Sequence, residues 1–281
     1  MVKISAKDVK SLRDQTGAGM MDCKKALNEA EGDIDKAIEL LRKRGQKLAG
    51  KRADREAKEG VVIAKTSGNR NNGVILRLSC ETDFVAKTEK FVELANAVAD
   101  IALKSLPDTT EDLLALPFDS ELTVAKKIEE QIGVIGEKLE VNKYSKIVTE
   151  AGKGQVIPYI HMGHRAAVIA ALNLEGPKFI DTGKDVAMQI AAMRPVALDE
   201  SGVDAATIEK EIEIGKEQAR QEGKPEAILD KIAKGKLNKF LKENTLLNQK
   251  FVKDNKKTIQ QYLESVDKNL TVTDFKHVEL G

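Results

Sequence analysis

The chain has 281 residues, of which 41% are hydrophobic, 4% aromatic and 32% charged, and its 46 basic and 45 acidic residues give a net charge of +1. This length favours two or three domains, and the apolar fraction excludes a wholly disordered protein. The balanced charge argues against a dedicated nucleic-acid binder, and the few aromatic residues leave little material for stacking single-stranded bases.

Residues 1–45 are predicted to form three short helices. A glycine turn over Gly17–Gly19 separates the first helix from a second over residues 21–30. Asp33 caps a third helix, which we expect Gly45 to end. A unit of this size is near the lower limit for an independent core, which indicates a docking module rather than a catalytic domain.

Residues 42–58 carry eight basic side chains and two acidic ones. This stretch is either a solvated helix end that leads into a linker or an RNA-binding stripe. The acidic neighbours Asp54 and Glu56 and the lack of aromatic residues favour the solvated helix end.

Two blocks that combine strands with a helix are predicted next. In the first, apolar strands over residues 61–64 and 74–78 form a hairpin, and a helix over residues 84–103 packs on it. A further helix is expected near residues 122–132. The second block is expected to contain three strands and a helix, over residues 138–149, 155–161, 166–173 and 179–193. The similar order suggests an internal repeat of hairpin plus helix.

The C-terminal part begins with two highly charged helices, over residues 204–221 and 226–241. Gly223-Lys224-Pro225 between them is typical of the end of one helix and the beginning of the next, so the pair is expected to form a helical hairpin. A helix over residues 258–265 and a strand over residues 272–280 complete the chain. The predicted fold class is a multidomain α+β protein.

The usual catalytic and metal-binding patterns are missing from the sequence. It contains no GxxxxGK[ST] phosphate loop, no GxGxxG at a helix start and no GxSxG. Cys23 and Cys80 lack zinc-ligand spacing, and His161 and His164 fall in a predicted strand, where they face opposite ways. We therefore expect no catalytic residue, no metal and no cofactor. The polar start and the lack of any run of 18 apolar residues indicate a soluble, cytoplasmic protein with reduced thiols.

Two segments are not explained by packing alone. Met20 and Met21 follow the glycine turn, and we expect at least one of them on the surface, the alternative being that both fill gaps under the three helices. Thr82 is a suitable N-cap, which places Asp83 at the positive end of a helix and Phe84 in its first turn. The ring is either a wedge aimed at a partner or part of the hairpin–helix core.

Together, the segments Thr16–Leu27 and Thr82–Val85 resemble the signature of the bacterial-type elongation factor Ts family. The resemblance runs through nearly the whole chain, with further matches in the same order at Ile135-Gly136-Glu137, Tyr159-Ile160-His161, Gly223-Lys224-Pro225 and Phe251-Val252. It implies an N-terminal ubiquitin-associated-like module of three helices with a linker (1–55) and a two-part α+β core with antiparallel sheets (56–145 and 146–281). A helical hairpin is implied as an insertion at about residues 199–242.

The resemblance also implies a function, that of a guanine-nucleotide exchange factor. Such a protein binds the GDP-bound form of elongation factor Tu, a translational GTPase, and promotes GDP release by disturbing its magnesium and phosphate site. The implied docking residues for the GTPase domain are Arg13, Met20 and Met21. The implied magnesium-displacing wedge consists of Thr82, Asp83, Phe84 and Val85. The implied contacts to the third domain of the GTPase are His161 and Val252.

The implied partners are this GTPase and a second copy of the chain, bound through the helical hairpin, with no membrane and no direct nucleic acid. Two positions depart from the family pattern: Gln189 stands where many relatives carry histidine, and Lys253 where some carry an apolar residue. Two other hypotheses remain open, an RNA-associated protein that uses residues 42–58 and a ubiquitin-associated-like scaffold without exchange activity. Salt-dependent RNA binding would support the first, and partner function unchanged by Phe84→Ala would support the second.

Overall fold

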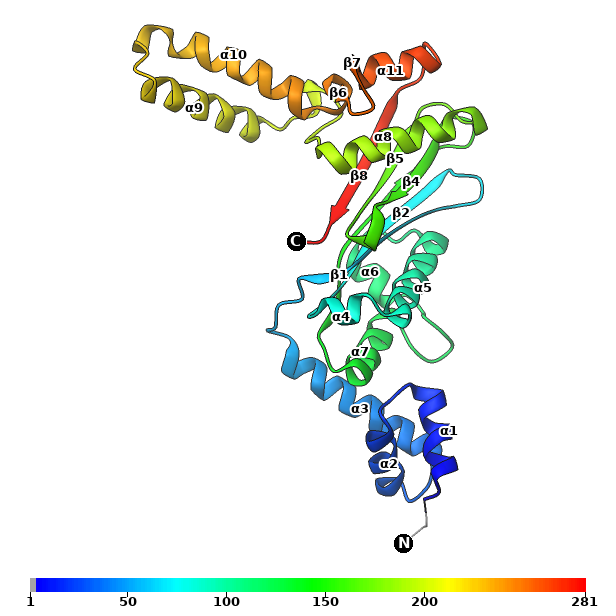
Figure 1. Cartoon of the computed structure of the whole chain (residues 1–281). Coiled ribbons are helices and arrows are strands. Elements are labelled where there is room, and N and C mark those ends of the chain that lie inside the picture. Colours follow the sequence, from blue (N-terminus) through cyan, green and yellow to red (C-terminus); the bar gives the residue numbers. More distant parts are fainter. Residues whose placement is uncertain (1–3) are drawn as a thin grey trace.

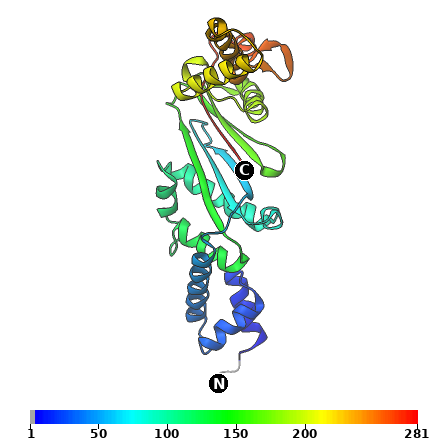
Figure 2. The same ribbon diagram turned by 90° about the vertical axis from the view of Figure 1, so that its left-hand side faces the viewer.

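The computed structural model describes residues 4–281, a mixed α/β chain whose sheets are antiparallel, as the sequence predicts. Figure 1 shows an elongated molecule with the N-terminal helices at one end, two three-stranded sheets in the middle and a pair of long helices that projects from the other end. The view turned by 90° keeps this order along the long axis (Figure 2).

The N-terminal end consists of α1 (Ala6–Thr16), α2 (Met20–Glu29) and the first half of α3 (Ile34–Arg52). We call residues 4–41 the N-terminal module. Its small core is made of apolar side chains from all three helices, namely Val9, Leu12, Ala18, Cys23, Ala26, Leu27, Ala30 and Ala37. Gly17 ends α1 with a φ of 71°, in the left-handed region that glycine adopts without strain.

The prediction that Gly45 ends the third helix is wrong, because α3 continues to Arg52. Gly45 lies against α7 (Val124–Ile135). A Cβ atom built on Gly45 would lie 3.0 Å from the carbonyl oxygen of Glu129, and one built on Gly133 would lie 2.7 Å from the Cα atom of Gly45. The two helices therefore touch backbone to backbone. A glycine inside a helix costs about 0.5–1 kcal/mol relative to alanine, and here it permits the close approach.

The first sheet has the order β1-β2-β3, with β1 at Glu59–Thr66, β2 at Asn72–Cys80 and β3 at Leu139–Val148. Four helices lie between β2 and β3 in the sequence: α4 (Asp83–Ala86), α5 (Glu89–Ser105), α6 (Thr110–Ala115) and α7. Helix α5 packs on β1 and β2 and buries Phe91, Leu94, Ala95, Val98, Ala99 and Ala102.

Two details of this region differ from the prediction. The helix expected over residues 84–103 is divided in two, because the Thr88 side chain accepts a hydrogen bond from the Phe91 N–H and starts α5 anew. Helix α6 was not predicted, and a capping box of Thr109 and Asp112 starts it.

The second sheet has the order β4-β5-β8, with β4 at Gln155–Ile160, β5 at Ala166–Leu172 and β8 at Val272–Glu279. Helix α8 (Ile180–Met193) follows β5 and packs on β4 and β5. Each sheet is thus a hairpin, a helix that covers it and a third strand that pairs with the second, which confirms the predicted repeat of hairpin plus helix. The strand over residues 138–149, expected in the second block, is instead β3 of the first sheet, because it pairs with β2. The sheets pack on each other through Val62, Ala64, Ile75, Ile147, Val156, Ala167, Ile169, Ala171, Val278 and Leu280.

The long helices at the far end are α9 (Ala205–Gln221) and α10 (Glu226–Asn244), which pack on each other. After them come β6 (Lys250–Phe251), β7 (Asp254–Thr258) and α11 (Ile259–Val266). The β6–β7 pair was not predicted, because its strands are short and mostly polar.

Within residues 4–281, no helix has both the length and the apolar character needed to cross a membrane. The domain boundaries at residues 55 and 145 stay a prediction.

Both cysteine side chains are fully buried. Burial raises the pKa of the Cys23 thiol and raises that of Cys80 to about 12. Because the thiolate is the reactive form, we expect both thiols of the native protein to react with Ellman's reagent at pH 8 about a hundredfold more slowly than in guanidinium chloride. Release of thionitrobenzoate, followed at 412 nm, measures this, and a thiol that reacts equally fast under both conditions would contradict the prediction.

Candidate functional site

The side chain of Phe84 is 80% exposed to solvent. It lies in the first turn of α4, a four-residue helix in which only Ala86 is buried. The ring is therefore not part of the hairpin–helix core, and the interpretation that placed it there is wrong. An exposed aromatic ring offers a large apolar contact area to a partner. We call residues 81–86 the Phe84 turn.

Thr82 and Glu137 fix the start of this turn. The Thr82 hydroxyl accepts a hydrogen bond from the Val85 N–H, as expected for an N-cap. Thr82 also donates twice to Glu137, from its hydroxyl to Oε1 at 2.6 Å and from its backbone N–H to Oε2 at 3.0 Å. Glu137 follows Gly136, which ends α7 with a φ of 81°. The end of α7 therefore sets the position of the Glu137 carboxylate that binds Thr82.

Glu81 anchors the same turn from the other side. Its carboxylate accepts hydrogen bonds from Arg52 at 2.6 Å, from Arg55 at 2.9 Å and from the Lys138 N–H at 2.7 Å. Burial alone would raise the pKa of Glu81, but these three hydrogen bonds lower it to about 2. The Phe84 turn is therefore held by side chains from the end of α3 and by the backbone before β3.

Asp83 lies next to the exposed ring. Its carboxylate forms an ion pair with Lys87 at 2.5 Å, and the hydrogen bond from Lys87 lowers the pKa of Asp83 below its usual range. The group is therefore ionised at neutral pH. The Phe84 turn presents a carboxylate beside an aromatic ring, a pair that can attract a cation and fill an apolar pocket.

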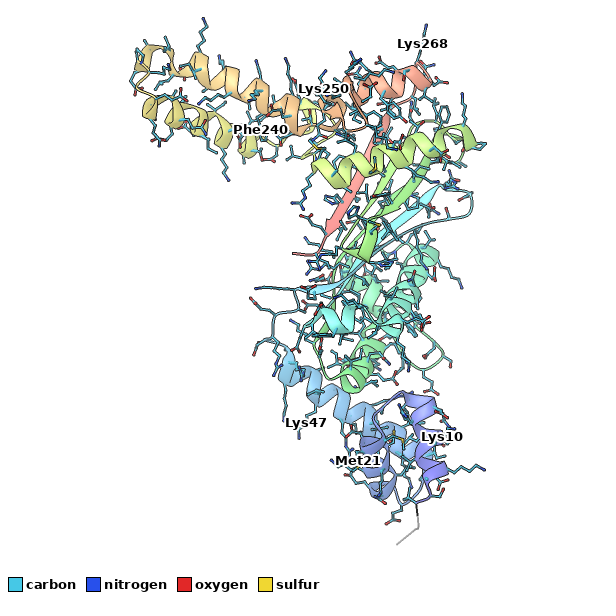
Figure 3. All side chains as sticks on the ribbon, viewed as in Figure 1. Lys10, Met21, Lys47, Phe240, Lys250 and Lys268 are labelled. Atoms are coloured by element: carbon cyan, nitrogen blue, oxygen red, sulfur yellow. The ribbon has the colours of Figure 1, made fainter. Side chains whose placement is uncertain are left out.

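A second exposed group lies on the N-terminal module. Met20 and Met21, in the first turn of α2, are 47% and 64% exposed, so both side chains face solvent where at least one was expected to. Figure 3 labels Met21 at the module end of the molecule. Arg13, in the last turn of α1, is also exposed, and the glycine turn connects it to the two methionines.

His161 is exposed just after β4. Its Nδ1 atom lies 3.1 Å from the hydroxyl of Tyr159. The prediction that His161 and His164 lie in a strand is wrong, because β4 ends at Ile160 and residues 162–164 form a short 3-10 turn between β4 and β5. Met162, at the start of that turn, is 88% exposed and was not identified from the sequence.

Val252 is 46% exposed at the β6–β7 connection, and a buried side chain holds its backbone. Gln189, fully buried on α8, accepts a hydrogen bond from the Val252 N–H at 2.9 Å. It also donates to the Lys250 carbonyl at 3.1 Å. Lys253 forms an ion pair with Asp185 at 2.6 Å. The two departures from the family pattern thus both connect α8 to the segment that carries Val252.

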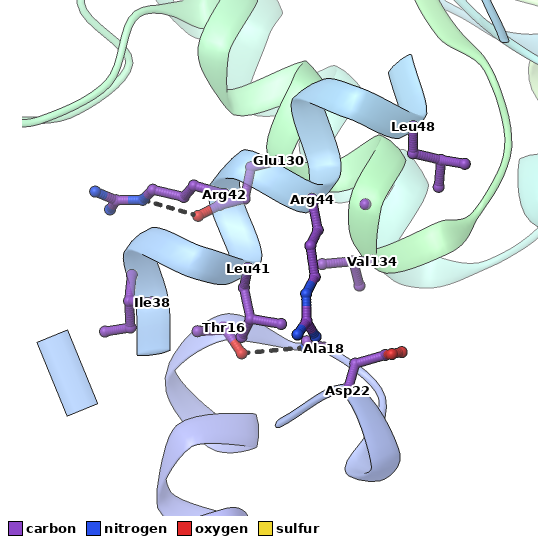
Figure 4. A pocket seen from close by; sticks show the side chains of 11 residues that line it. Thr16, Ala18, Asp22, Ile38, Leu41, Arg42, Arg44, Leu48, Glu130 and Val134 are labelled. Atoms are coloured by element: carbon purple, nitrogen blue, oxygen red, sulfur yellow. Dashed lines mark hydrogen bonds and ion pairs between the residues drawn. The ribbon is translucent and has the colours of Figure 1, made fainter. Parts of the chain in front are cut away.

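A cavity of about 270 Å³ lies between the N-terminal module and α7 (Figure 4). Its apolar lining comes from Ala18, Ile38, Leu41, Leu48 and Val134. Two arginines also line it, but Arg42 is paired with Glu121 at 2.7 Å and Arg44 with Glu29 at 2.6 Å. Since these cations are already compensated, the cavity has no free positive charge to hold an anion.

Within residues 4–281 there is no group of three or more His, Cys, Asp or Glu side chains that could hold a metal ion.

The structure brings together the four predicted wedge residues in one turn and the three predicted docking residues on one module. The roles of Glu81 and Glu137 were not predicted from the sequence. Glu137 lies in the segment Ile135-Gly136-Glu137, which resembles the family and was the available signal, but its partner Thr82 lies 55 residues away.

The profile of the family described as "Elongation factor TS" matches residues 81–281. Elongation factor Ts of Amoebophilus asiaticus is 51% identical over 279 residues, which cover 99% of each chain. That of Christiangramia forsetii is 50% identical over 281 residues and 100% of each chain. That of Porphyromonas gingivalis is 46% identical over 278 residues, which are 99% of this chain and 98% of its own. The chain therefore belongs to the elongation factor Ts family of translation elongation factors.

Proposed function

We propose that this protein binds the GDP-bound form of elongation factor Tu and accelerates GDP release during translation elongation in the cytoplasm. The observation that carries the proposal is the exposed Phe84 beside the ionised Asp83, on a turn held by Glu81 and Glu137. An exposed ring on a fixed turn suits insertion into a partner, because little backbone freedom is lost on binding. Family membership supports the role in elongation.

Differential binding explains how such a turn would promote release. A factor that binds the nucleotide-free or distorted GTPase more tightly than the nucleotide-bound form lowers the affinity for nucleotide, and the nucleotide lowers the affinity for the factor by the same amount. Each tenfold change corresponds to about 1.4 kcal/mol. Asp83 and Phe84 would supply this difference near the magnesium and phosphate site. No covalent bond is made or broken, so the factor needs no catalytic residue.

The other exposed groups would supply docking energy. Arg13, Met20 and Met21 would bind the GTPase domain from a module that we propose is ubiquitin-associated-like. His161 and Val252 would contact the third domain of the GTPase. The α9–α10 hairpin would serve self-association, with the partly exposed side chains of Ile214 and Ile228 as apolar contacts.

The RNA-binding alternative is disfavoured by the pairing of its basic residues. Six of the eight basic side chains in residues 42–58 form ion pairs with carboxylates, namely Arg42, Lys43, Arg44, Arg52, Arg55 and Lys58. A side chain that is already paired contributes less to phosphate binding, since its ion pair must first be broken.

Stopped-flow release of a fluorescent GDP from elongation factor Tu, at fixed magnesium, tests the proposal. We expect the release rate to rise with the concentration of this protein and to reach a plateau, because release then occurs from a saturable complex. Binding without acceleration would favour the scaffold hypothesis, and salt-dependent binding to RNA without binding to the GTPase would favour the RNA hypothesis.

A further inference from the structure

We propose that α3 acts as a rigid spacer, with Gly45 and Gly133 as positioning residues that hold the N-terminal module at a fixed distance from the Phe84 turn. The inference rests on the proposed function. It assigns a role in exchange to two glycines that are not among the proposed partner-contact residues. The role follows from how α3 is attached to the rest of the chain.

The crossing of α3 and α7 is the main attachment of the module. Helices α1 and α2 pack on α3, and α3 in turn packs on α7. The cavity of about 270 Å³ lies between the module and α7, so side-chain packing there is incomplete (Figure 4). At the crossing the backbones of Gly45 and Gly133 touch. A crossing this close leaves no room for a side chain, and the two glycines therefore set the separation of the helices.

Ion pairs lie on either side of the glycines and add to the contacts between α3 and the core. On the module side, Arg42 pairs with Glu121 at 2.7 Å and approaches Glu130 at 3.7 Å. At the far end, Arg52 pairs with Glu81 at 2.6 Å. With contacts before, at and after the crossing, α3 is held in one orientation relative to the core.

The contact between Arg52 and Glu81 connects α3 to the Phe84 turn. Glu81 immediately precedes Thr82, so the carboxylate that binds the end of α3 belongs to the Phe84 turn itself. A continuous helix therefore runs from the module that carries Met20 and Met21 to the turn that carries Phe84. If both sites bind one partner, a fixed spacing makes the second contact effectively intramolecular, and a wrong spacing removes that advantage.

The test variant is Gly133→Ala, whose new methyl group would lie 2.7 Å from the Cα atom of Gly45. The matched control is Gly50→Ala, also within α3, where an added Cβ meets nothing within 4 Å. GDP release from elongation factor Tu is measured against factor concentration. We expect Gly133→Ala to lower the plateau rate about tenfold while the half-saturating concentration changes less than threefold, because the docking side chains are intact. The control stays within twofold of the unmodified chain on both measures.

The second measurement is the spacing itself. Spin labels on Lys10→Cys and Lys143→Cys, both exposed positions, report the distance from module to core by double electron–electron resonance. Cys23 and Cys80 are buried and remain unlabelled. We expect a shifted or broadened distance distribution in Gly133→Ala and an unchanged one in Gly50→Ala.

Three results would overturn the inference. A shifted distance with an unchanged plateau rate would show that the Phe84 turn promotes GDP release independently of the position of the N-terminal module. An unchanged distance in Gly133→Ala would show that the glycines do not set the spacing. If the unmodified chain fails to accelerate release, the proposed function itself fails, and the coupling with it. Should Gly133→Ala not fold, Gly45→Ala replaces it, since its added methyl group meets a milder contact at 3.0 Å.

Discussion

Phe84→Ala is expected to lower the plateau rate of GDP release from elongation factor Tu about thirtyfold, which corresponds to about 2 kcal/mol, the effect of removing an aromatic hot-spot side chain. Arg13→Ala and Met20→Ala are expected to raise the half-saturating concentration instead, about fivefold, and to leave the plateau near that of the unmodified chain. Under the proposed function, Phe84 would act on the nucleotide site, whereas Arg13 and Met20 would only hold the factor on the GTPase. Stopped-flow titration of each variant separates the two quantities.

Val148→Ala is the matched control for Phe84→Ala. Val148 is another exposed apolar side chain, 57% accessible, at the end of β3. Its truncation should change neither quantity by more than about twofold. Because Phe84 is exposed, its own truncation should shift the free energy of unfolding by less than about 0.5 kcal/mol. An equal loss of binding in all three site variants, with normal release at saturation, would contradict this division of roles.

Glu81→Gln is expected to lower the free energy of unfolding at pH 7 by about 3 kcal/mol. Hydrogen bonds from Lys138, Arg55 and Arg52 outweigh burial and hold the pKa of Glu81 at about 2, below the ordinary value of 4.5. A carboxyl with a lowered pKa stabilises the fold fully above its unfolded pKa and loses that contribution as the pH falls from about 5 toward 2. The unmodified chain should therefore lose stability over this range, and Glu81→Gln should lose less.

Urea unfolding at several pH values between 3 and 7 measures this difference. Glu56→Gln serves as the control, because Glu56 also pairs with a basic residue, Lys58, but both side chains are more than two-thirds exposed. An exposed pair contributes little, so the control should leave the free energy of unfolding nearly unchanged. If Glu81→Gln and the unmodified chain lose stability in parallel between pH 5 and pH 3, the stabilising role of Glu81 is refuted.

The sequence predicted most helices and strands, because their apolar periodicity is local. The prediction failed where a tertiary contact determines the structure. A glycine such as Gly45 is typical of a helix end, but here it lies inside α3 against Gly133, and no local sequence pattern shows that contact. The break before α5 depends on the single cap at Thr88, inside an otherwise helical pattern. The β6–β7 pair contains too few apolar residues to be recognised.

The candidate site was predicted in its exposed residues and not in their supports. The unusual neighbours Asp83 and Phe84 can be recognised in the sequence, although whether the ring faces out depends on the core beneath it. Glu81 and Glu137 could not be assigned, because the side chains they hold come from elements 26 to 55 residues away. Charged residues are common in this chain, and only proximity distinguishes a clamp from a solvated carboxylate.

The repeated plan of the two sheets provides an internal comparison for Phe84. In each half, an aromatic residue lies in the connection from the second hairpin strand to the covering helix: Phe84 after β2 and Phe179 after β5. Phe84 is 80% exposed, whereas Phe179 is 2% exposed and packs into the second core. The architecture therefore accommodates a buried ring at this point, so the exposure of Phe84 is a property of its own half. One half of the core thus uses its ring for packing, and the other half leaves its ring available to a partner.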